Sequence, residues 1–482
     1  MNETRKFVKE SVVYTLGDIF AKSLAFILIP IFTRYLIKSD YAIYNIVITI
    51  WPVLVIIYFK GIAGYMIRGY FELKAENDKK EFFGSLILLS LFISVVFSGI
   101  MHLFGDQLFS PLFKDISYKP YLQFAVGIAF FKLFIHNVLT IYRTKRKPLT
   151  VVSLSVFNFA INVSIIVLFV VFLKKELIGA LYGQLISLAI IASLFFIYIQ
   201  KDIRYKLRMN YVRTALLFAL PLIPHALSAW IINLSDRILI ERFSTLENLA
   251  VYALGYQLAM SLDILINSMN QAWMPFFYSN AANKDQQKEL MKSTTFYFTL
   301  VVAIGLLMSL YSREIILFAG KMEYIEATKI FPMIVLGFVI HSIYYMSSAA
   351  IFYKNKTYLV PIISITAGIF NIGLNIWWLP KIGYIAAAYS TIISFAVMAV
   401  MGYFFAQRCF PIPFQFSKLL AIFSIAFSLY AISQILQFEY WLYAIPFKAG
   451  IFLLFPLSLI LTNLVQIKDI RNFRSIFFSV KK

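Results

Sequence analysis

SVVYTLGDIFAKSLAFILIPIFTRYL, residues Ser11–Leu36, is the stretch that decides the fold, and it runs directly into IKSDYAIYN. The run is long enough to cross a bilayer, because about 20 apolar residues suffice. It nevertheless carries Asp18 and Lys22 one helical turn apart. Its apolar part exceeds that of a signal peptide, so we expect it to remain in the mature protein.

The composition is that of a polytopic membrane protein. Of the 482 residues, 61% are hydrophobic and only 14% are charged, with a mean hydropathy of +0.80. This excludes a soluble all-helical protein, and the continuous apolar runs exclude a β-barrel, whose strands alternate. We predict about fourteen transmembrane helices, because a spanning helix satisfies its own backbone hydrogen bonds. They are expected near 11–36, 41–60, 83–104, 121–142, 149–173, 177–200, 214–240, 249–277, 293–318, 328–353, 358–379, 383–407, 415–437 and 441–465.

The basic residues predict the topology. With the N-terminus placed in the cytoplasm, 28 of the 44 lysines and arginines fall in cytoplasmic segments and 11 in outer loops, as the positive-inside rule requires. Both termini are therefore predicted to be cytoplasmic. Membrane topology accounts for much of the net charge of +21, so no nucleic-acid partner is expected. The single cysteine, Cys409, allows no internal disulfide.

The chain repeats itself at an offset of about 208 residues, and each repeat holds six predicted spans. An even number of spans gives both copies the same orientation, so two lobes are expected to be related by a pseudo-two-fold axis along the membrane normal. The predicted domains are 1–208, 209–410 and 411–482, the last being an additional helix pair with a tail. Three windows recur in order: Thr33–Tyr44 with Glu241–Tyr252, Phe157–Asn162 with Phe370–Asn375, and Ile178–Ser187 with Ile385–Ser394.

The opening stretch resembles the N-terminal signature of bacterial polysaccharide-repeat-unit flippases, the O-antigen and capsule transporters of the multidrug/oligosaccharidyl-lipid/polysaccharide (MOP) exporter superfamily. The chain departs from that signature at Ala42, where glycine is usual. The matching residues are Tyr14, Gly17, Pro30, Phe32, Arg34, Tyr35, Leu36, Asp40, Tyr41 and Tyr44.

This resemblance implies a two-lobed transporter rather than an enzyme. It would move undecaprenyl-diphosphate-linked oligosaccharide from the cytoplasmic to the outer leaflet of the bacterial cytoplasmic membrane by alternating access. Polysaccharide polymerases and glycosyltransferases are candidate partners. No GxxxxGK[ST] motif is present, so a gradient of H⁺ or Na⁺ is the expected energy source, and no other cofactor is expected.

Charged residues inside the spans are candidate substrate contacts, because such groups are costly in the bilayer and usually face a cavity or each other. Asp18 and Lys22 either form a structural pair or bind the lipid diphosphate. Lys132, with His136 one turn away, and Arg237 are further candidates. Lys60 is also a candidate, although Lys60 and Lys448 lie near span ends, from which long side chains reach the headgroups.

Four oxygen-bearing side chains form a candidate coupling-ion site: Asp236, Asn371, Asn375 and Thr391. The set resembles the sodium site of the related lipid II flippases, but Asn375 stands where that family has a second carboxylate. In the first repeat, Leu28 and Gln184 stand at the positions of Asp236 and Thr391. The alternative is that the asparagines only form hydrogen bonds that pack helices together.

Two other functions compete with the flippase. A multidrug or cation antiporter of the same superfamily should have twelve spans and lack Arg34-Tyr35-Leu36. A membrane-embedded polysaccharide polymerase or ligase should carry a large outer loop with catalytic Arg or His, and the predicted outer loops are too short for one.

Overall fold

The computed structural model describes residues 25–281, 287–412, 414–435 and 441–464. Over these residues the chain is helical and contains no β-strand. Thirteen helices or helix runs in this part are long and apolar enough to cross a membrane, which confirms the all-α polytopic fold. They match thirteen of the fourteen predicted spans; of the first, only residues from Ala25 onward are described.

The spans agree with the predicted ranges to within a few residues at most ends. The largest departure is the predicted span 293–318, whose helix ends at Leu310 and is followed by the separate helix α14 (Ser312–Ala319). The third span also extends beyond its predicted range at both ends, as a helix of 34 residues. The helices are α3 (Lys38–Ile57), α5 (Glu76–Phe109), α6 (Gln123–Thr144), α7 (Pro148–Val167), α8 (Glu176–Ile199), α12 (Leu246–Ala281), α13 (Gln287–Leu310), α15 (Ala327–Tyr353), α16 (Leu359–Ile382), α17 (Ile385–Cys409), α18 (Phe416–Ile435) and α19 (Trp441–Leu461).

The predicted span 214–240 is a series of short helices rather than one continuous helix. Pro221 and Pro224 stand at the starts of η5 (Leu220–Leu222) and α10 (Ile223–Leu234), because proline suits the first turn of a helix and disrupts its interior. The series begins with α9 (Met209–Ala219) and ends with α11 (Asp236–Phe243). It thereby places Asp236 at the start of a helix.

The predicted duplication is visible in the helix boundaries. Helix α2 (Leu28–Tyr35) and helix α11 both have eight residues, and their first residues, Leu28 and Asp236, are equivalent positions of the repeat. Helices α3 and α12 likewise begin at equivalent positions, Lys38 and Leu246. The same spacing at two successive helix starts shows that the two halves fold alike around the repeated window.

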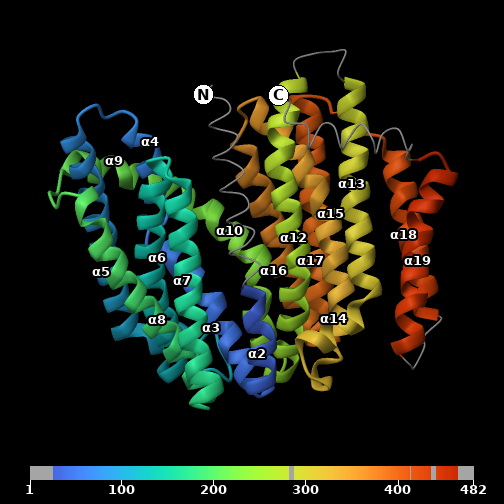
Figure 1. Cartoon of the computed structure of the whole chain (residues 1–482), viewed down its shortest axis with the longest axis horizontal. Helices are drawn as coiled ribbons and strands as arrows, with labels where there is room; N and C mark the ends of the chain where they lie inside the picture. Colours follow the sequence, from blue (N-terminus) through green and yellow to red (C-terminus); the bar gives the residue numbers. More distant parts are fainter. Residues whose placement is uncertain (1–24, 282–286, 413, 436–440, 465–482) are drawn as a thin grey trace. The chain divides into compact units, whose positions relative to one another are not determined.

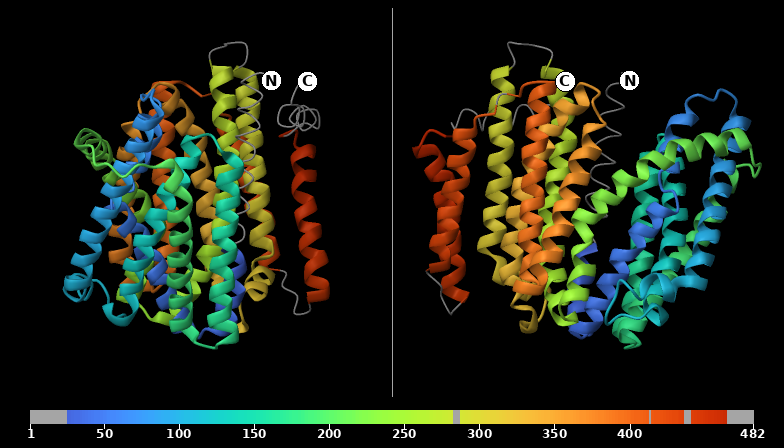
Figure 2. Two further views of the ribbon diagram at one scale, coloured as in Figure 1. Left: turned by 60° about the vertical axis from the view of Figure 1, so that its left-hand side comes forward. Right: turned by 180° about the vertical axis from the view of Figure 1, so that it is seen from behind.

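The chain forms two compact units. Of the described residues, the first unit contains those up to residue 253 together with 372–387, and the second contains those from 254 to 371 and from 388 onward. In the first unit, α6 packs against α3, α5, α7 and α8 (Figure 1). In the second, α13 packs against α15 and α18, and α18 packs against α19 (Figure 2). The division at residues 208 and 410 stays a prediction.

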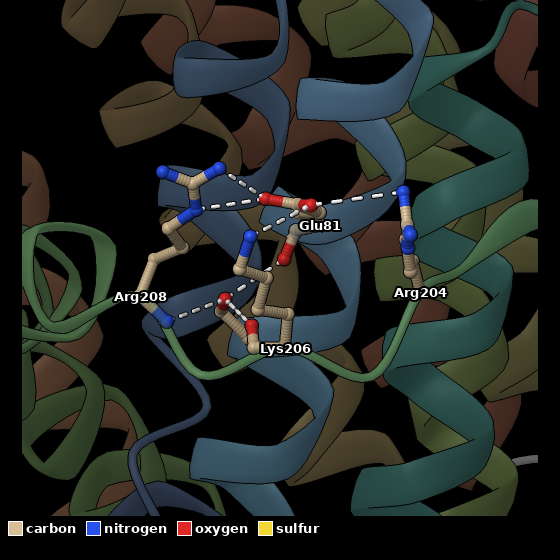
Figure 3. A network of polar contacts seen from close by, with 5 residues as sticks. Glu81, Arg204, Lys206 and Arg208 are labelled. Carbon is tan, nitrogen blue, oxygen red and sulfur yellow. Dashed lines mark hydrogen bonds and ion pairs between the residues drawn. The ribbon is translucent and has the colours of Figure 1, made fainter.

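A buried carboxylate ties α5 to the segment before α9 in the first unit. Glu81 is only 5% exposed and accepts a hydrogen bond from Arg208 Nε at 2.7 Å, and Lys206 Nζ lies 3.4 Å from it. Arg204 adds a longer contact of 3.9 Å (Figure 3). One turn on, the Ser85 hydroxyl donates to the Lys206 carbonyl and accepts from the Arg208 amide. The basic segment is thus held on α5 both by ion pairs to Glu81 and by backbone hydrogen bonds to Ser85.

The added helix pair is held by an ion pair in the second unit. Lys448 Nζ of α19 lies 2.6 and 2.7 Å from the two carboxylate oxygens of Glu314, in α14 (Ser312–Ala319). Lys448 thus has a carboxylate partner within the protein, and the expectation that it reaches the headgroups stays a prediction.

Candidate functional site

Asp236 is a fully buried carboxylate in the first unit. It begins α11, and none of its surface is exposed. The Tyr252 hydroxyl of α12 donates a hydrogen bond to Asp236 Oδ2 at 2.5 Å. The Asn375 amide of α16 lies 3.5 Å from Asp236 Oδ1. A buried carboxylate needs such partners, because removing it from water without compensation is costly.

The other predicted ion ligands are also buried. Asn371 stands one helical turn before Asn375 on α16, and Thr391 lies on α17. Neither exposes any surface. The structure thus brings together Asp236 and Asn375 of the predicted set. Asn371 and Thr391 belong to the second unit, and their role as ligands stays a prediction.

Tyr252 is a residue of this site that sequence reasoning missed. It closes the repeated window Glu241–Tyr252, and its counterpart in the first repeat is Tyr44. The recurrence of this tyrosine in both copies of the window was visible in the sequence. Its hydrogen bond to Asp236, however, depends on how α11 and α12 fold against each other. The predicted site holds a carboxylate, two amides and the Thr391 hydroxyl. The phenolic hydroxyl of Tyr252 is a further oxygen group.

A second feature of the first unit is a cationic face of α6. Lys132, His136 and Arg143 recur at helical spacing and are all partly exposed, whereas most of their neighbours on α6 are buried. Lys132 Nζ lies 4.7 Å from the centre of the Trp51 ring of α3. Lys60 is exposed in the turn between α3 and α4 (Ile62–Tyr70).

The remaining substrate candidates have different surroundings. Asp18 and Lys22 lie outside the described residues. Arg237 is 2% exposed, and its Nη1 donates to the Asn233 carbonyl at 3.0 Å. The structure thus places Lys132 one turn from His136, leaves Lys60 exposed, and buries Arg237, which follows Asp236 in the chain. The assignment of all five residues to substrate binding stays a prediction.

These two features differ in chemistry. Lys132 and Arg143, the partly exposed cations of α6, have the charge and hydrogen-bond donors that hold a phosphate group. The buried oxygen groups around Asp236 have the chemistry that hard cations prefer. Both features lie on helices or helix runs that are long and apolar enough to cross a membrane.

The family of the chain follows from its sequence. It belongs to the polysaccharide biosynthesis protein family, whose sequence profile matches residues 7–281. A Haemophilus influenzae protein of the Lsg locus is 23% identical over 368 residues, which cover 74% of this chain and 87% of that protein. An uncharacterised membrane protein of the same organism is 23% identical over 325 residues, 65% of this chain and 76% of that one.

Solved structures share the fold at low sequence identity. The lipid II flippase MurJ in an inward closed conformation aligns with a TM-score of 0.76 at 16% identity, over 94% of this chain and 100% of MurJ. An inward-facing multidrug resistance transporter of the MATE family aligns with a TM-score of 0.66 at 16% identity, over 84% and 96% of the two chains. The family match confirms the predicted relation to polysaccharide biosynthesis proteins, and these neighbours show that the chain has the fold of MurJ and of MATE transporters.

Proposed function

We propose that this protein moves undecaprenyl-diphosphate-linked oligosaccharide units from the cytoplasmic to the outer leaflet of the bacterial cytoplasmic membrane, with both termini in the cytoplasm. The products would supply O-antigen or capsule synthesis, in which polymerases and glycosyltransferases are the expected partners. The two lobes would alternate access to the substrate, driven by a gradient of H⁺ or Na⁺ in an antiport cycle.

The cationic face of α6 is the observation that carries this proposal. A lipid diphosphate bears about two negative charges, and desolvating it requires cations at close range. Lys132 supplies such a charge on a membrane-spanning helix, and His136, one turn away, adds a hydrogen-bond donor; both side chains are partly exposed. Lys60, which is exposed in the turn after α3, is a further lysine of the same unit.

A drug antiporter of the same superfamily is supported less well. The MATE likeness concerns the fold alone. Helices α18 and α19 lie beyond the duplicated part, whereas a twelve-span antiporter would end with α17. The Arg34-Tyr35-Leu36 motif also favours the flippase.

Deletion and complementation in the host strain test the function. Loss of the gene should leave lipid-linked oligosaccharide on the cytoplasmic face, where an added membrane-impermeant glycosidase cannot reach it in intact cells. Wild-type protein should restore surface glycan. Lys22→Ala, Lys60→Ala, Lys132→Ala and Arg237→Ala should each impair it, while Lys321→Ala, an exposed lysine, should not. Normal export by all four variants would contradict this account of substrate binding.

A further inference from the structure

Asp263 and His341 form a buried acid–base pair in the second unit. Asp263 lies halfway along α12, and His341 lies halfway along α15. Both helices qualify as membrane spans, so the pair lies far from either end of the bundle. The carboxylate side chain is 19% exposed and the histidine side chain 8%.

The two side chains are close but not hydrogen-bonded. His341 Nδ1 lies 3.8 Å from Asp263 Oδ1, which is about 1 Å longer than a hydrogen bond between charged groups. Both ring nitrogens of His341 are buried without a hydrogen-bond partner among the described residues. Such orphaned buried groups are rare and costly, so this imidazole requires an explanation.

Aromatic rings hold the imidazole in place. The Phe395 ring of α17 stacks on it with 4.4 Å between centroids and 10° between planes. The rings of Tyr344 and Tyr345 lie 5.6 and 4.6 Å away. The packing orients His341 toward Asp263 and surrounds it with rings, so a proton on Nδ1 would have the carboxylate as its nearest partner.

The groups that contact Asp263 are neutral in the part of the chain that the structure describes. The Asn267 amide donates to Asp263 Oδ2 at 2.9 Å, and the Tyr345 hydroxyl lies 3.5 Å from Oδ1. Tyr297 of α13 is close enough to be affected by the carboxylate, and its hydroxyl donates to the Ile266 carbonyl. Within the described ranges, no lysine or arginine forms an ion pair with Asp263.

We propose that Asp263 and His341 bind a proton and form the site through which a proton gradient drives transport. The inference rests on the proposed function and names its coupling ion. The proton comes from water on one side of the membrane, adds to His341 Nδ1 and is released to water on the other side. When bound, it gives an imidazolium that moves into contact with the carboxylate; when it leaves, the pair separates.

The repeat argues that this pair is a specialisation of one lobe. Val55 of α3 stands at the position equivalent to Asp263 of α12, and it is buried and apolar. A carboxylate is therefore not needed for this helix to fold. The site also differs from that of Asp236, which belongs to the first unit and has Tyr252 and Asn375 as partners.

Proton binding can be tested without a transport substrate. The chain has four histidines, so ¹³C-histidine NMR of the full-length protein in nanodiscs gives few signals, and His341→Gln assigns the one of interest. We expect the His341 signal to respond to pH in the wild-type protein and its midpoint to change in Asp263→Asn. Asp106→Asn, an exposed carboxylate on α5, should leave the midpoint unchanged. A signal that ignores pH, or the same midpoint in Asp263→Asn, would overturn the site.

Coupling is tested in liposomes with a fluorescent polyprenyl-diphosphate N-acetylglucosamine as probe. A gradient of one pH unit should drive up to about tenfold accumulation of the probe in one leaflet per proton coupled. Asp263→Asn and His341→Gln should lose this accumulation, whereas His102→Gln, an exposed histidine on α5, should keep it. Probe that moves in wild-type protein regardless of the gradient overturns the coupling but not the flippase. Probe that never moves contradicts the proposed function, and the NMR titration then decides the proton site.

Discussion

The Tyr252 hydroxyl donates to Asp236 Oδ2 at 2.5 Å, and both side chains are completely buried. In the first repeat the tyrosine is kept as Tyr44, but the aspartate is replaced by Leu28. The pair therefore belongs to the second copy of the repeated window alone, which makes the first copy a natural control.

Tyr252→Phe should weaken cation binding at Asp236. A hydrogen bond to a charged group contributes about 1.5–3 kcal/mol, and its loss leaves the carboxylate less well positioned. The measurement is the rise in Tm of the purified protein when sodium replaces N-methylglucamine. We expect a smaller rise in Tyr252→Phe, none in Asp236→Asn, and the wild-type rise in Tyr44→Phe. A sodium effect that survives Asp236→Asn would refute this ion site.

Gly84→Ala should destabilise the first unit. A Cβ atom at Gly84 would lie 2.0 Å from the Arg204 carbonyl oxygen, so the segment that Glu81 holds against α5 would have to move. Overpacking of this kind costs about 1–3 kcal/mol. Gly99 lies on the same helix, and no described atom lies within 4 Å of a Cβ added there. Thermal unfolding in nanodiscs should show a lower Tm for Gly84→Ala only; equal Tm values for both variants would contradict the close contact.

Asp202→Asn should also lower stability. Asp202 Oδ1 lies 2.6 Å from Lys145 Nζ, and the Tyr142 hydroxyl donates to Oδ2 at 2.6 Å. The charged side chains of Lys145 and Asp202 are 14% and 12% exposed, so removing one charge leaves the other poorly compensated. We expect a loss of about 2–4 kcal/mol in the free energy of unfolding. Adding Lys145→Met should recover part of it; a double variant with the summed loss would show that the two residues do not interact.

Reversing the charges of Lys448 and Glu314 tests how α19 is attached. Glu314→Lys alone places two cations together and should increase proteolysis within the α18–α19 pair. The double variant Glu314→Lys/Lys448→Glu should restore much of the protection, because the ion pair is re-formed with opposite polarity. Lys329→Glu, on an exposed lysine of α15, should not rescue Glu314→Lys. If Lys329→Glu did restore protection, the effect of Glu314→Lys would come from the net charge of the region and not from the loss of the Glu314–Lys448 ion pair.

Hydropathy predicted the spans well because a long apolar run in the bilayer must satisfy its own backbone hydrogen bonds, which a helix does. The repeat predicted that Leu28 and Asp236 correspond, and both residues begin eight-residue helices. Hydropathy did not predict the interruptions in the span containing Asp236, since Pro221 and Pro224 barely change its mean value. The position of each proline within the span, rather than its hydropathy, decides where the helices end.

The sites were predicted less completely, because their partners are distant in sequence. Asp236 and Asn375 could be named from residue type and depth, but Tyr252 could not be connected to them before α11 and α12 were placed. His341 was one of four scattered histidines, and Asp263, on a different helix, was not recognised as its neighbour. Pairs of this kind become visible only when two helices pack and show which faces meet.

The matching starts of α2 and α11 also bear on how this protein arose. Helix α2 begins with leucine and helix α11 with aspartate, yet both start at equivalent positions of the repeat and both have eight residues. The helix therefore forms at this position with either a leucine or an aspartate as its first residue. An ancestral half could have gained or lost its carboxylate without refolding, so duplication would have left one copy free to acquire ion chemistry while the other kept the architecture intact.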